Sequence, residues 1–409
     1  MSRFGLIGAT LGHSYSKQIH GLLGNPDYSY FELTPKELDT FMRAKAFCGV
    51  NVTIPYKVDV MPYCDFISDE ARSIGSVNTI VNRGGKLLGF NTDAYGFAYT
   101  AKRASISFKD KKVIILGSGG TSRTARYVVS TQGARETVVV SRTGENNYQN
   151  LHLHYDADVI INTTPVGMFP NMDASPITLD GFERLCGVID VIYNPSQTDL
   201  LFQSRERSIP YSNGLPMLVA QARRAHELFF DTSVEDGLTE QIVRKLSLAT
   251  QSIVLTGMPG SGKSTVGRLL AEKLSLPFVD TDALIAQTVG TSPSDFIKQN
   301  GESLFRDVEE NAVREALSGA RCVVATGGGA ILREQNRRLI ARQAFVVGLD
   351  AEDERLASDG RPLSRDLDAI HRLRAQREHL YQRVADVRIT TSNDPMKTLA
   401  EVLGAIGVG

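Results

Sequence analysis

The sequence predicts an α/β fold with two nucleotide-binding parts. Two glycine-rich loops, at residues 117–120 and 257–262, each follow an apolar, β-branched run: VIILG at 113–117 and SIVLTG at 252–257. Small and apolar residues at helical spacing follow each loop, and this order of strand, glycine loop and helix is typical of α/β nucleotide-binding folds. Further apolar runs at 137–141, 158–163 and 187–193 predict that the first loop belongs to one parallel sheet.

We expect four parts along the chain. Residues 1–96 have strand-like runs of their own and form a separate lobe, which helices at about 215–248 complete. Residues 97–214 form the lobe of the first glycine loop. Residues 249–252 are a linker, and residues 253–409 form the last domain. The helices are predicted at 215–230 and 238–248 from the spacing of their apolar residues. A chain of 409 residues has room for these parts, because domains commonly hold about 100–200 residues.

Composition and charge exclude several classes of protein. The 45 basic residues nearly balance the 46 acidic ones, which argues against a nucleic-acid binder or a membrane-surface protein. The first residues do not resemble a signal peptide, and no run of about 18 apolar residues predicts a membrane span. The four cysteines are far apart and form no CxxC pair, so neither a zinc site nor a disulfide framework is indicated. We therefore expect a soluble cytoplasmic protein with small-molecule substrates and with no nucleic-acid or membrane partner; the oligomeric state stays open.

The first glycine loop places backbone N–H groups at the start of a helix, where a pyrophosphate can bind. Its candidate cofactor residues are Gly117, Ser118, Gly119, Gly120 and Thr121. Alone it is a weak signal, since Ser122 stands where GxGxxG has its third glycine and an ordinary turn is nearly as plausible. The next strand ends in Ser141, Arg142 and Thr143, where NAD enzymes carry an acid for the ribose. A guanidinium with two hydroxyls suits a 2′-phosphate and favours NADP(H), although Arg142 could be only a solvated surface charge.

Seven short motifs occur in order over about the first 248 residues. They are Ser14 with Ser16 (an SxS pair), NVTIPYK at 51–57, VNT at 77–79, NTDAYG at 91–96, GSGG at 117–120, NTTPVGM at 162–168 and GLPMLVAQ at 214–221. Together they resemble the shikimate dehydrogenase family, which implies a substrate lobe and a Rossmann lobe that binds NADP(H). Lys17 and Gly21 stand where the family often has proline and asparagine, a difference that bears on the preferred substrate rather than on the reaction.

The resemblance implies a role for each of these polar residues. The substrate carboxylate would be bound by Ser14, Ser16 and Thr53 with Tyr193 beside them, the ring hydroxyls by Asn78, Asp93 and Gln221, and the cofactor in part by Gly214. Lys57 and Asp93 would form the catalytic pair, because hydride transfer to a ketone leaves an alkoxide that an ammonium group can protonate. Taken singly, Lys57 could be a surface lysine and Asp93 a helix cap.

The second glycine loop, GMPGSGKST at 257–265, satisfies the P-loop pattern GxxxxGK[ST] and follows a predicted strand. Its backbone N–H groups can hold the phosphates of ATP, Lys263 can reach the β- and γ-phosphates, and Ser264 can bind Mg²⁺. The other candidate nucleotide-binding residues of the loop are Gly260, Ser261, Gly262 and Thr265.

Five further motifs follow the P-loop and narrow the class of nucleotide-binding domain. They are FVDTD at 278–282, GESLFRDVE at 301–309, ATGGGA at 325–330, GRPL at 360–363 and REHLY at 377–381. In this order they resemble shikimate kinase over nearly all of residues 252–409, which implies a parallel-sheet P-loop domain of the nucleoside monophosphate kinase type. The stretch 349–362 is shorter than is usual in that family and bears on nucleotide affinity and lid closure.

This second resemblance also implies roles. Asp282 would contact the acceptor hydroxyl as base or orienting group, Arg306 and Arg377 would bind the shikimate carboxylate, the backbone at Gly328 would line the pocket, Arg361 would bring positive charge from a lid, and Asp280 would hold Mg²⁺ through water. The residues alone leave other interpretations open. Arginines in acid-rich helices commonly form surface i,i+4 pairs, and an aspartate at a helix start is commonly a cap.

The two resemblances together predict a bifunctional enzyme of the shikimate pathway in aromatic amino-acid biosynthesis. It would reduce 3-dehydroshikimate to shikimate with NADPH and then phosphorylate shikimate with ATP to shikimate 3-phosphate. Three alternatives stay open: a quinate/shikimate dehydrogenase fused to a P-loop kinase, one half kept as a non-catalytic binding or regulatory module, and a P-loop ATPase that acts on nucleic acid. The small size of the last domain and the lack of a basic stripe disfavour the third.

Overall fold

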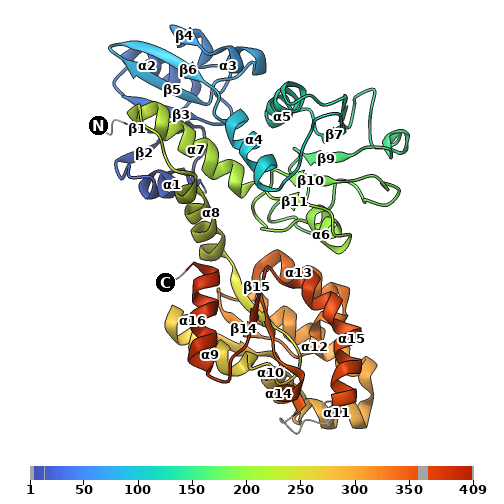
Figure 1. The fold of residues 1–409 in the computed structure, drawn as a ribbon. Coiled ribbons are helices and arrows are strands. Elements are labelled where there is room, and N and C mark those ends of the chain that lie inside the picture. The colour runs from blue at the N-terminus through green and yellow to red at the C-terminus, as the bar shows by residue number, and fades with distance from the viewer. Residues whose placement is uncertain (1–3, 13, 358–366, 408–409) are drawn as a thin grey trace. The chain divides into compact units, whose positions relative to one another are not determined.

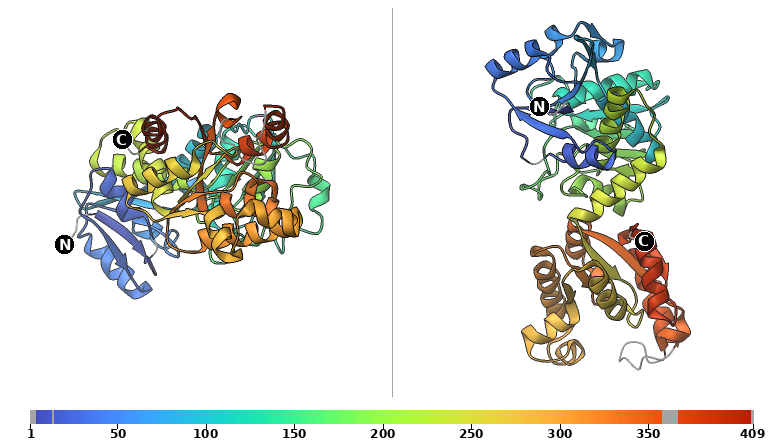
Figure 2. Two further views of the ribbon diagram at one scale, coloured as in Figure 1. Left: turned by 90° about the horizontal axis from the view of Figure 1, so that it is seen from below. Right: turned by 90° about the vertical axis from the view of Figure 1, so that its left-hand side faces the viewer.

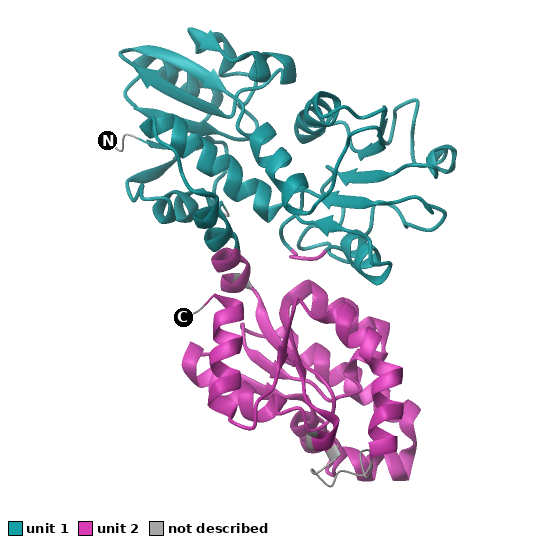
Figure 3. Cartoon of the chain, viewed as in Figure 1, with its two compact units in different colours: residues 1–194, 198–243 teal, residues 195–197, 244–409 magenta. Residues whose placement is uncertain are grey.

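The computed structural model of this chain describes residues 4–12, 14–357 and 367–407. Contacts divide the chain into two compact units, residues 1–194 with 198–243 and residues 195–197 with 244–409 (Figure 3). The division falls inside helix α8 (Asp236–Thr250). The described strands form three sheets flanked by helices, which confirms the predicted α/β class. Of the helices that the structure describes, none is both long and apolar enough to cross a bilayer.

The first lobe of unit 1 is built on a six-stranded sheet in the order β2-β1-β3-β5-β6-β4. Its strands are β1 (Phe4–Gly8), β2 (Tyr28–Glu32), β3 (Gly49–Val52), β4 (Phe66–Ile67), β5 (Thr79–Arg83) and β6 (Lys86–Phe90). β1 is parallel to β2 and β3, whereas β5 is antiparallel to β3 and β6. β4 is parallel to β6 at the other edge, so the sheet is mixed.

Helices cover both faces of this mixed sheet. They are α1 (Ser16–Leu22), α2 (Pro35–Ala44), η1 (Met61–Tyr63), α3 (Asp69–Ile74) and α7 (Leu215–Phe230). Thr34 and Glu37 form a capping box at the start of α2, which packs Leu38 and Met42 on one face of the sheet. Phe229 of α7 packs on the other face, so the chain returns to its first lobe (Figure 1). The helix expected at 215–230 is thereby confirmed.

The second lobe of unit 1 has five parallel strands in the order β11-β10-β9-β7-β8. They are β7 (Lys112–Leu116), β8 (Glu136–Val140), β9 (Val159–Asn162), β10 (Gly187–Asp190) and β11 (Tyr211–Ser212). Runs such as KVIIL and VIIN are apolar without alternation, which is typical of parallel strands buried on both faces. Helices α4 (Asp93–Arg103) and α5 (Gly120–Thr131) cover one face, and α6 (Asp199–Glu206) with η2 (Leu151–His154) covers the other. The predicted single parallel sheet is confirmed.

A glycine lets two helices of unit 1 touch. A Cβ atom on Gly96 of α4 would lie 2.5 Å from the carbonyl oxygen of Met217 and 3.0 Å from the Cβ of Gln221, both on α7. Any side chain at position 96 would therefore separate the two helices. This contact bears on function, because α4 begins at Asp93 and α7 carries Gln221, two of the predicted site residues.

Unit 2 is built on five parallel strands in the order β13-β14-β12-β15-β16. The strands are β12 (Ser252–Thr256), β13 (Phe278–Asp280), β14 (Val323–Ala325), β15 (Ala344–Asp350) and β16 (Val387–Thr390). The helices are α9 (Lys263–Leu274), α10 (Thr281–Val289), α11 (Pro293–Asn300), α12 (Glu302–Ser318), η3 (Ala330–Leu332), α13 (Glu334–Gln343), α14 (Asp353–Ala357), α15 (Leu367–Val384) and α16 (Pro395–Ile406). α9 and α16 pack on one face of the sheet, and α12, α13 and α15 pack on the other (Figures 1 and 2).

A histidine lies fully buried in the first lobe of unit 1. The ring of His20 stacks on Tyr28 with the ring centroids 4.0 Å apart, and its Nε2 lies 3.1 Å from Oδ1 of Asn51. Its Nδ1 has no hydrogen-bond partner among the described residues. Burial, together with the neighbouring His226, lowers the pKa of His20 from 6.5 to about 3. The folded unit therefore holds this imidazole neutral over most of the acidic range.

This lowered pKa predicts that unit 1 loses stability in acid. The folded pKa lies below the unfolded one, so the stabilisation is complete above pH 6.5 and is lost as the pH falls towards about 3. The loss amounts to about 1.4 kcal/mol for each pH unit below the unfolded pKa. His20→Gln keeps a donor for Asn51 but cannot titrate, and is expected to flatten this dependence.

The measurement is the denaturant midpoint of unit 1 near pH 7.5 and near pH 5. Hydrogen exchange of peptides from β1 and β3 reports the unfolding of this unit at each denaturant concentration. His152→Gln serves as control, because His152 is exposed. Equal acid sensitivity in His20→Gln and in the unmodified chain would show that His20 does not cause the loss of stability in acid.

Candidate active sites

The lysine and aspartate predicted to act together form an ion pair in unit 1. Nζ of Lys57 donates to Oδ2 of Asp93 over 2.6 Å, with the two side chains 28% and 16% exposed. Lys57 lies on the loop after β3, and its carbonyl oxygen accepts from the N–H of Val77. Asp93 is the first residue of α4, where a negative charge is favoured, and its N–H donates to Oδ1 of Asn91. The pair is thus held at both ends and can pass a proton to a bound group.

Asn78 is oriented by its neighbours. Its Oδ1 accepts from the N–H of Thr92 at 2.7 Å and lies within 3.2 Å of the hydroxyls of Thr79 and Thr92. With Oδ1 surrounded by donors, the NH₂ group of Asn78 is the part of the amide that can serve a ligand. Thr92 also reaches Oε1 of Gln221 at 3.5 Å. Sequence reasoning missed Thr92 as a link between Asn78 and Gln221, although it stands inside the NTDAYG motif.

The two serines of the SxS pair lie at the start of α1, with Ser14 before the helix and Ser16 as its first residue. Oγ of Ser14 donates to Oγ of Ser16 at 3.0 Å and accepts from the N–H of Ser16. The ring of Tyr15 between them contacts Tyr193 edge-on, with the centroids 5.7 Å apart. Burial, and the nearby Tyr15 and Tyr30, raise the pKa of Tyr193. The structure therefore brings Tyr193, from the loop after β10, to the serine pair. Thr53 follows β3, and its N–H donates to the carbonyl of Ile7.

The first glycine loop leaves open space at the start of α5. A Cβ atom on Gly119 or Gly120 would meet nothing within 4 Å, and α5 has no side-chain cap. Gly117 has φ of +100° and packs against Thr163. The first N–H groups of α5 are thus available to an anion.

The remaining predicted cofactor residues surround this loop or support its neighbours. Ser118 and Thr121 belong to the loop and the first turn of α5, and Ser141, Arg142 and Thr143 directly follow β8, which pairs with β7. Gly214 precedes α7 and donates its N–H to the carbonyl of Ile192 at 3.0 Å; a Cβ there would lie 1.9 Å from the carbonyl oxygen of Val191. A residue other than glycine would push the loop after β10 away from α7.

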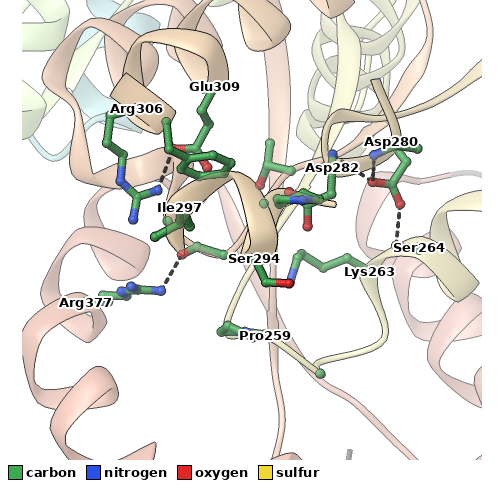
Figure 4. A pocket seen from close by; sticks show the side chains of 18 of the residues that line it. Pro259, Lys263, Ser264, Asp280, Asp282, Ser294, Ile297, Arg306, Glu309 and Arg377 are labelled. Carbon is green, nitrogen blue, oxygen red and sulfur yellow. Dashed lines mark hydrogen bonds and ion pairs between the residues drawn. The ribbon is translucent and has the colours of Figure 1, made fainter. Parts of the chain in front are cut away.

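Unit 2 encloses a cavity of about 920 Å³ at the carboxyl ends of its strands (Figure 4). Its walls bring together the predicted residues Gly260, Gly262, Lys263, Ser264, Thr265, Asp280, Asp282, Arg306, Gly328 and Arg377. Pro259, Phe305, Ile297 and Glu309 also line it and were not among the residues expected from the sequence. Arg361 lies outside the described residues.

The P-loop wraps around its own lysine. Nζ of Lys263 donates to the carbonyl oxygens of Gly257 and Met258 at 2.9 and 2.8 Å. Gly260 and Gly262 have φ near +87° and +85°, a conformation that favours glycine and turns the loop around the ammonium group. Ser261 is fully buried beneath the loop. Positive charge is therefore concentrated at the mouth of the loop, next to the start of α9.

Asp280 caps a helix and also contacts the serine of the P-loop. One oxygen caps α10 by accepting from the N–H groups of Asp282 and Ala283, and the other accepts from the hydroxyl of Ser264 at 2.6 Å (Figure 4). The helix-cap interpretation is thus correct. It is compatible with a position beside the P-loop serine, where a cation would be bound.

The two arginines of the cavity form ion pairs and hydrogen bonds with neighbouring residues. Arg306 pairs with Glu302 and with Glu309 at 2.7 Å each, so the expected pairing within the helix is present, yet its side chain is only 12% exposed and faces the cavity. Burial raises the pKa of Glu309, with Asp282 adding to the effect. Arg377 donates from Nη1 to the carbonyl of Gly328, and its Nε has no partner among the described residues. Glu309 could have been found from its position three residues after Arg306.

Comparison with known proteins finds relatives of both units. The family model of the shikimate dehydrogenase substrate binding domain matches residues 6–80, and that of shikimate kinase matches residues 259–406. The shikimate dehydrogenase (NADP(+)) of Clostridium beijerinckii is 36% identical over 260 residues, 59% of this chain and 96% of that protein.

Two solved structures extend this likeness to the fold. A chorismate mutase/shikimate 5-dehydrogenase fusion protein from Clostridium acetobutylicum is 36% identical, with a TM-score of 0.56 over 60% of this chain and 96% of that one. The shikimate 5-dehydrogenase from Thermus thermophilus, in complex with NADP(H) and shikimate, is 29% identical, with a TM-score of 0.55 over 60% of this chain and 99% of that one.

The double contact of Asp280 can be tested without measuring activity. Asp280→Ala removes the cap of α10 and is expected to destabilise that helix by about 1 kcal/mol, whereas Asp280→Asn keeps an acceptor for the cap. Hydrogen exchange at the amides of Asp282 and Ala283 should quicken in the alanine variant and stay near the unmodified rate in the asparagine variant. Unchanged exchange in both variants would show that Asp280 does not cap the helix.

Proposed function

Because this chain belongs to the shikimate dehydrogenase family and carries a shikimate kinase domain at residues 259–406, we propose that one polypeptide catalyses two consecutive steps of the shikimate pathway. The first is the reduction of 3-dehydroshikimate to shikimate with NADPH, and the second is the phosphorylation of shikimate with ATP. The observation that carries the proposal is the presence of a Lys57–Asp93 pair at 2.6 Å in unit 1 and of a P-loop cavity with two arginines in unit 2. Reduction of the 3-keto group creates the hydroxyl that the kinase then phosphorylates.

In the reduction, this chain binds the cyclic keto acid and supplies a proton. The Ser14 and Ser16 hydroxyls, with Thr53 and Tyr193, bind the substrate carboxylate. The NH₂ group of Asn78 donates to a ring hydroxyl, since its Oδ1 already accepts from Thr92. Gln221 and Asp93 hold the remaining hydroxyls. The Lys57 ammonium donates a proton to the oxygen that becomes the alcohol, and Asp93 keeps that ammonium in place.

The open start of α5 fits the pyrophosphate of NADP(H), because the loop presents free backbone N–H groups and no side chain fills the space. Gly117 to Thr121 would hold the pyrophosphate. Arg142, with the hydroxyls of Ser141 and Thr143, would hold the 2′-phosphate, and Gly214 would support the nicotinamide end. When bound, NADPH supplies the hydride.

In the phosphorylation, the cavity of unit 2 neutralises charge and orients the acceptor. Arg306 and Arg377 bind the shikimate carboxylate, while Asp282 orients the acceptor hydroxyl and receives its proton. Lys263 exchanges the carbonyl oxygens of its own loop for phosphate oxygens, which are the stronger acceptors. These roles suit a loose transition state that needs positioning more than covalent chemistry.

The oxygens of Ser264 and Asp280, 2.6 Å apart on the cavity wall, fit Mg²⁺, which typically takes one or two protein oxygens together with waters and phosphates. Ser264 would bind the ion directly and Asp280 through a water. Mg²⁺ supplies charge neutralisation at the phosphates when bound.

We place the protein in the cytoplasm. Its four cysteines, Cys48, Cys64, Cys186 and Cys322, form no CxxC pair in the sequence, and a chain without a disulfide framework suits a reducing compartment. Fractionation of cells, with the two activities followed in each fraction, tests this location.

The two sites should be separable by single substitutions. Lys57→Ala is expected to lower kcat for the NADP⁺-dependent oxidation of shikimate by about a hundredfold or more, since it removes the group that accepts the hydroxyl proton in this direction and donates it in the reduction. Lys263→Ala is expected to stop ATP-dependent phosphorylation. Each variant should leave the other reaction unchanged, because the two residues belong to different units.

These rates are measured separately, as NADPH absorbance and as ADP release. Arg43→Ala, which breaks an exposed ion pair with Asp39 in the same lobe as Lys57, should alter neither rate. Loss of both reactions on either lysine substitution would refute the model of two independent sites. A comparison of turnover on quinate and on shikimate tests the alternative that unit 1 is a quinate/shikimate dehydrogenase.

A glycine of unit 2 allows a sharper test of Arg306. Gly329 has an ordinary negative φ, but a Cβ there would lie 2.2 Å from Nη1 of Arg306, so Gly329→Ala should displace the guanidinium with little effect on folding. The KM for shikimate in the kinase reaction is expected to rise about tenfold, as for the loss of one charged hydrogen bond. Gly404→Ala is the control, because its Cβ would meet nothing within 4 Å. An unchanged KM in Gly329→Ala would remove Arg306 from the substrate site.

A further inference from the structure

A carboxylate lies completely buried at the edge of the sheet in the second lobe of unit 1. Asp190 is the last residue of β10, is 0% exposed, and stands directly beside Asn162, the last residue of β9. Both side chains emerge at the carboxyl ends of parallel strands, the edge at which α/β sheets bind their ligands. None of the roles proposed above uses either residue.

Every contact of the Asp190 carboxylate is with a donor. Oδ1 accepts from Nδ2 of Asn162 and from the N–H of Ile192, both at 3.0 Å, and Oδ2 accepts from the hydroxyl of Thr198 at 2.7 Å. The direction of these bonds is fixed, because Oδ1 of Asn162 is already occupied by the N–H and hydroxyl of Thr164. Burial raises the pKa of Asp190 to about 6, and the three donors oppose that shift.

One set of these hydrogen bonds connects Asp190, through Asn162, to the first glycine loop (the cofactor loop). Asn162 holds Thr164 through both hydrogen bonds of its Oδ1, at 3.0 and 2.7 Å. Thr163 and Thr164 in turn form the wall against which Gly117 packs: a Cβ on Gly117 would lie 2.9 Å from Oγ1 of Thr163 and 3.0 Å from Cγ2 of Thr164. The side chain of Asn162 therefore sets the position of that wall, and Asp190 sets the side chain of Asn162.

A second set of contacts connects Asp190 to the predicted substrate site. Asp190 holds the N–H of Ile192, whose carbonyl accepts from the N–H of Gly214. The next residue is Tyr193, whose ring meets Tyr15 between the two serines of the SxS pair. The same carboxylate thus restrains the segment that carries Tyr193 into the substrate site.

We propose that Asp190 is a positioning residue of the dehydrogenase site, which fixes the Thr163–Thr164 wall of the cofactor loop and the Tyr193 segment relative to each other. This inference rests on the function proposed above for unit 1. The residue touches neither substrate nor cofactor and acts through Asn162 and Ile192. Its removal should leave three donors without an acceptor in a buried place, where the two loops would rearrange to find other partners.

The test compares Asp190→Ala with Asp190→Asn. The alanine variant lacks all acceptors and is expected to raise the KM for shikimate about tenfold and to weaken NADPH binding severalfold. The asparagine variant keeps an oxygen for Asn162 and Ile192, and its NH₂ group can donate to the hydroxyl of Thr198, so it should restore KM to within about threefold of the unmodified value. KM and binding constants do not depend on the fraction of folded molecules, which separates positioning from stability.

Asp158→Ala is the matched control. Asp158 is a buried aspartate at the other end of β9 and accepts from the N–H of Lys112, so its loss should reduce stability without changing KM. The kinase rate of each variant shows whether unit 2 of the same chain is still active. NADPH binding is followed by its fluorescence, which requires no turnover.

The outcomes are distinct. An unchanged KM and an unchanged NADPH affinity in Asp190→Ala, or the same KM change in Asp158→Ala, would overturn the assignment to Asp190. Absence of shikimate oxidation by the unmodified chain would instead refute the proposed function of unit 1, and the NADPH titration would still decide whether Asp190 holds the cofactor wall.

Discussion

Parallel pairing brings the carboxyl ends of neighbouring strands to one edge of a sheet, and the functional loops of this chain depend on that geometry. In the second lobe of unit 1, the glycine loop follows β7, the Thr163–Thr164 wall follows β9, and the segment of Tyr193 follows β10. In unit 2, the P-loop follows β12 and Asp280 ends β13. Because these strands are close neighbours in their sheets, loops separated by many residues in the chain meet at a single place.

The two units hold their polar residues in different ways. In unit 1 the amide of Asn78 is oriented by neutral groups, Thr79 and Thr92, and the ion pair of Lys57 with Asp93 is the charged contact of that site. In unit 2 the cavity is held by opposite charges, as Arg306 is by Glu302 and Glu309. Ring hydroxyls and a carbonyl group require direction from their partners, whereas the phosphates of ATP require neutralisation of charge. Each network matches the groups that its site would bind.

Close approaches of the backbone give both sites their shape. Gly96 lets the helix of Asp93 contact the helix of Gln221, and Gly329 leaves room for the guanidinium of Arg306. A side chain at position 329 would displace that guanidinium, and a side chain at position 96 would separate the two helices. The same requirement explains why Gly214 stands where the loop after β10 meets the start of α7.

The sequence by itself determined the α/β class, the parallel sheets, the helix at 215–230 and the two glycine loops, because these follow from local apolar spacing and from backbone conformations that only a few residues allow. It also supplied the motifs of both families. It left open whether Asp280 is a helix cap or holds Mg²⁺ through water, and whether Arg306 pairs within its helix or binds a carboxylate. The tertiary structure shows that Asp280 caps α10 and also accepts from Ser264, and that Arg306 pairs with Glu302 while it lines the cavity.

Only the tertiary structure revealed the partners that orient the site residues. Thr92 connects Asn78 with Gln221, Glu309 pairs with Arg306 in the cavity that Asp282 also lines, and Asp190 connects two loops of unit 1. The contacts of Thr92 and Asp190 join residues from different strands, helices or loops, so local sequence spacing does not mark them, whereas Glu309 lies three residues after Arg306 on α12. The direction of a hydrogen bond and the pKa of a buried group depend on which neighbours surround it and on how far water is excluded, and these are properties of the packed chain.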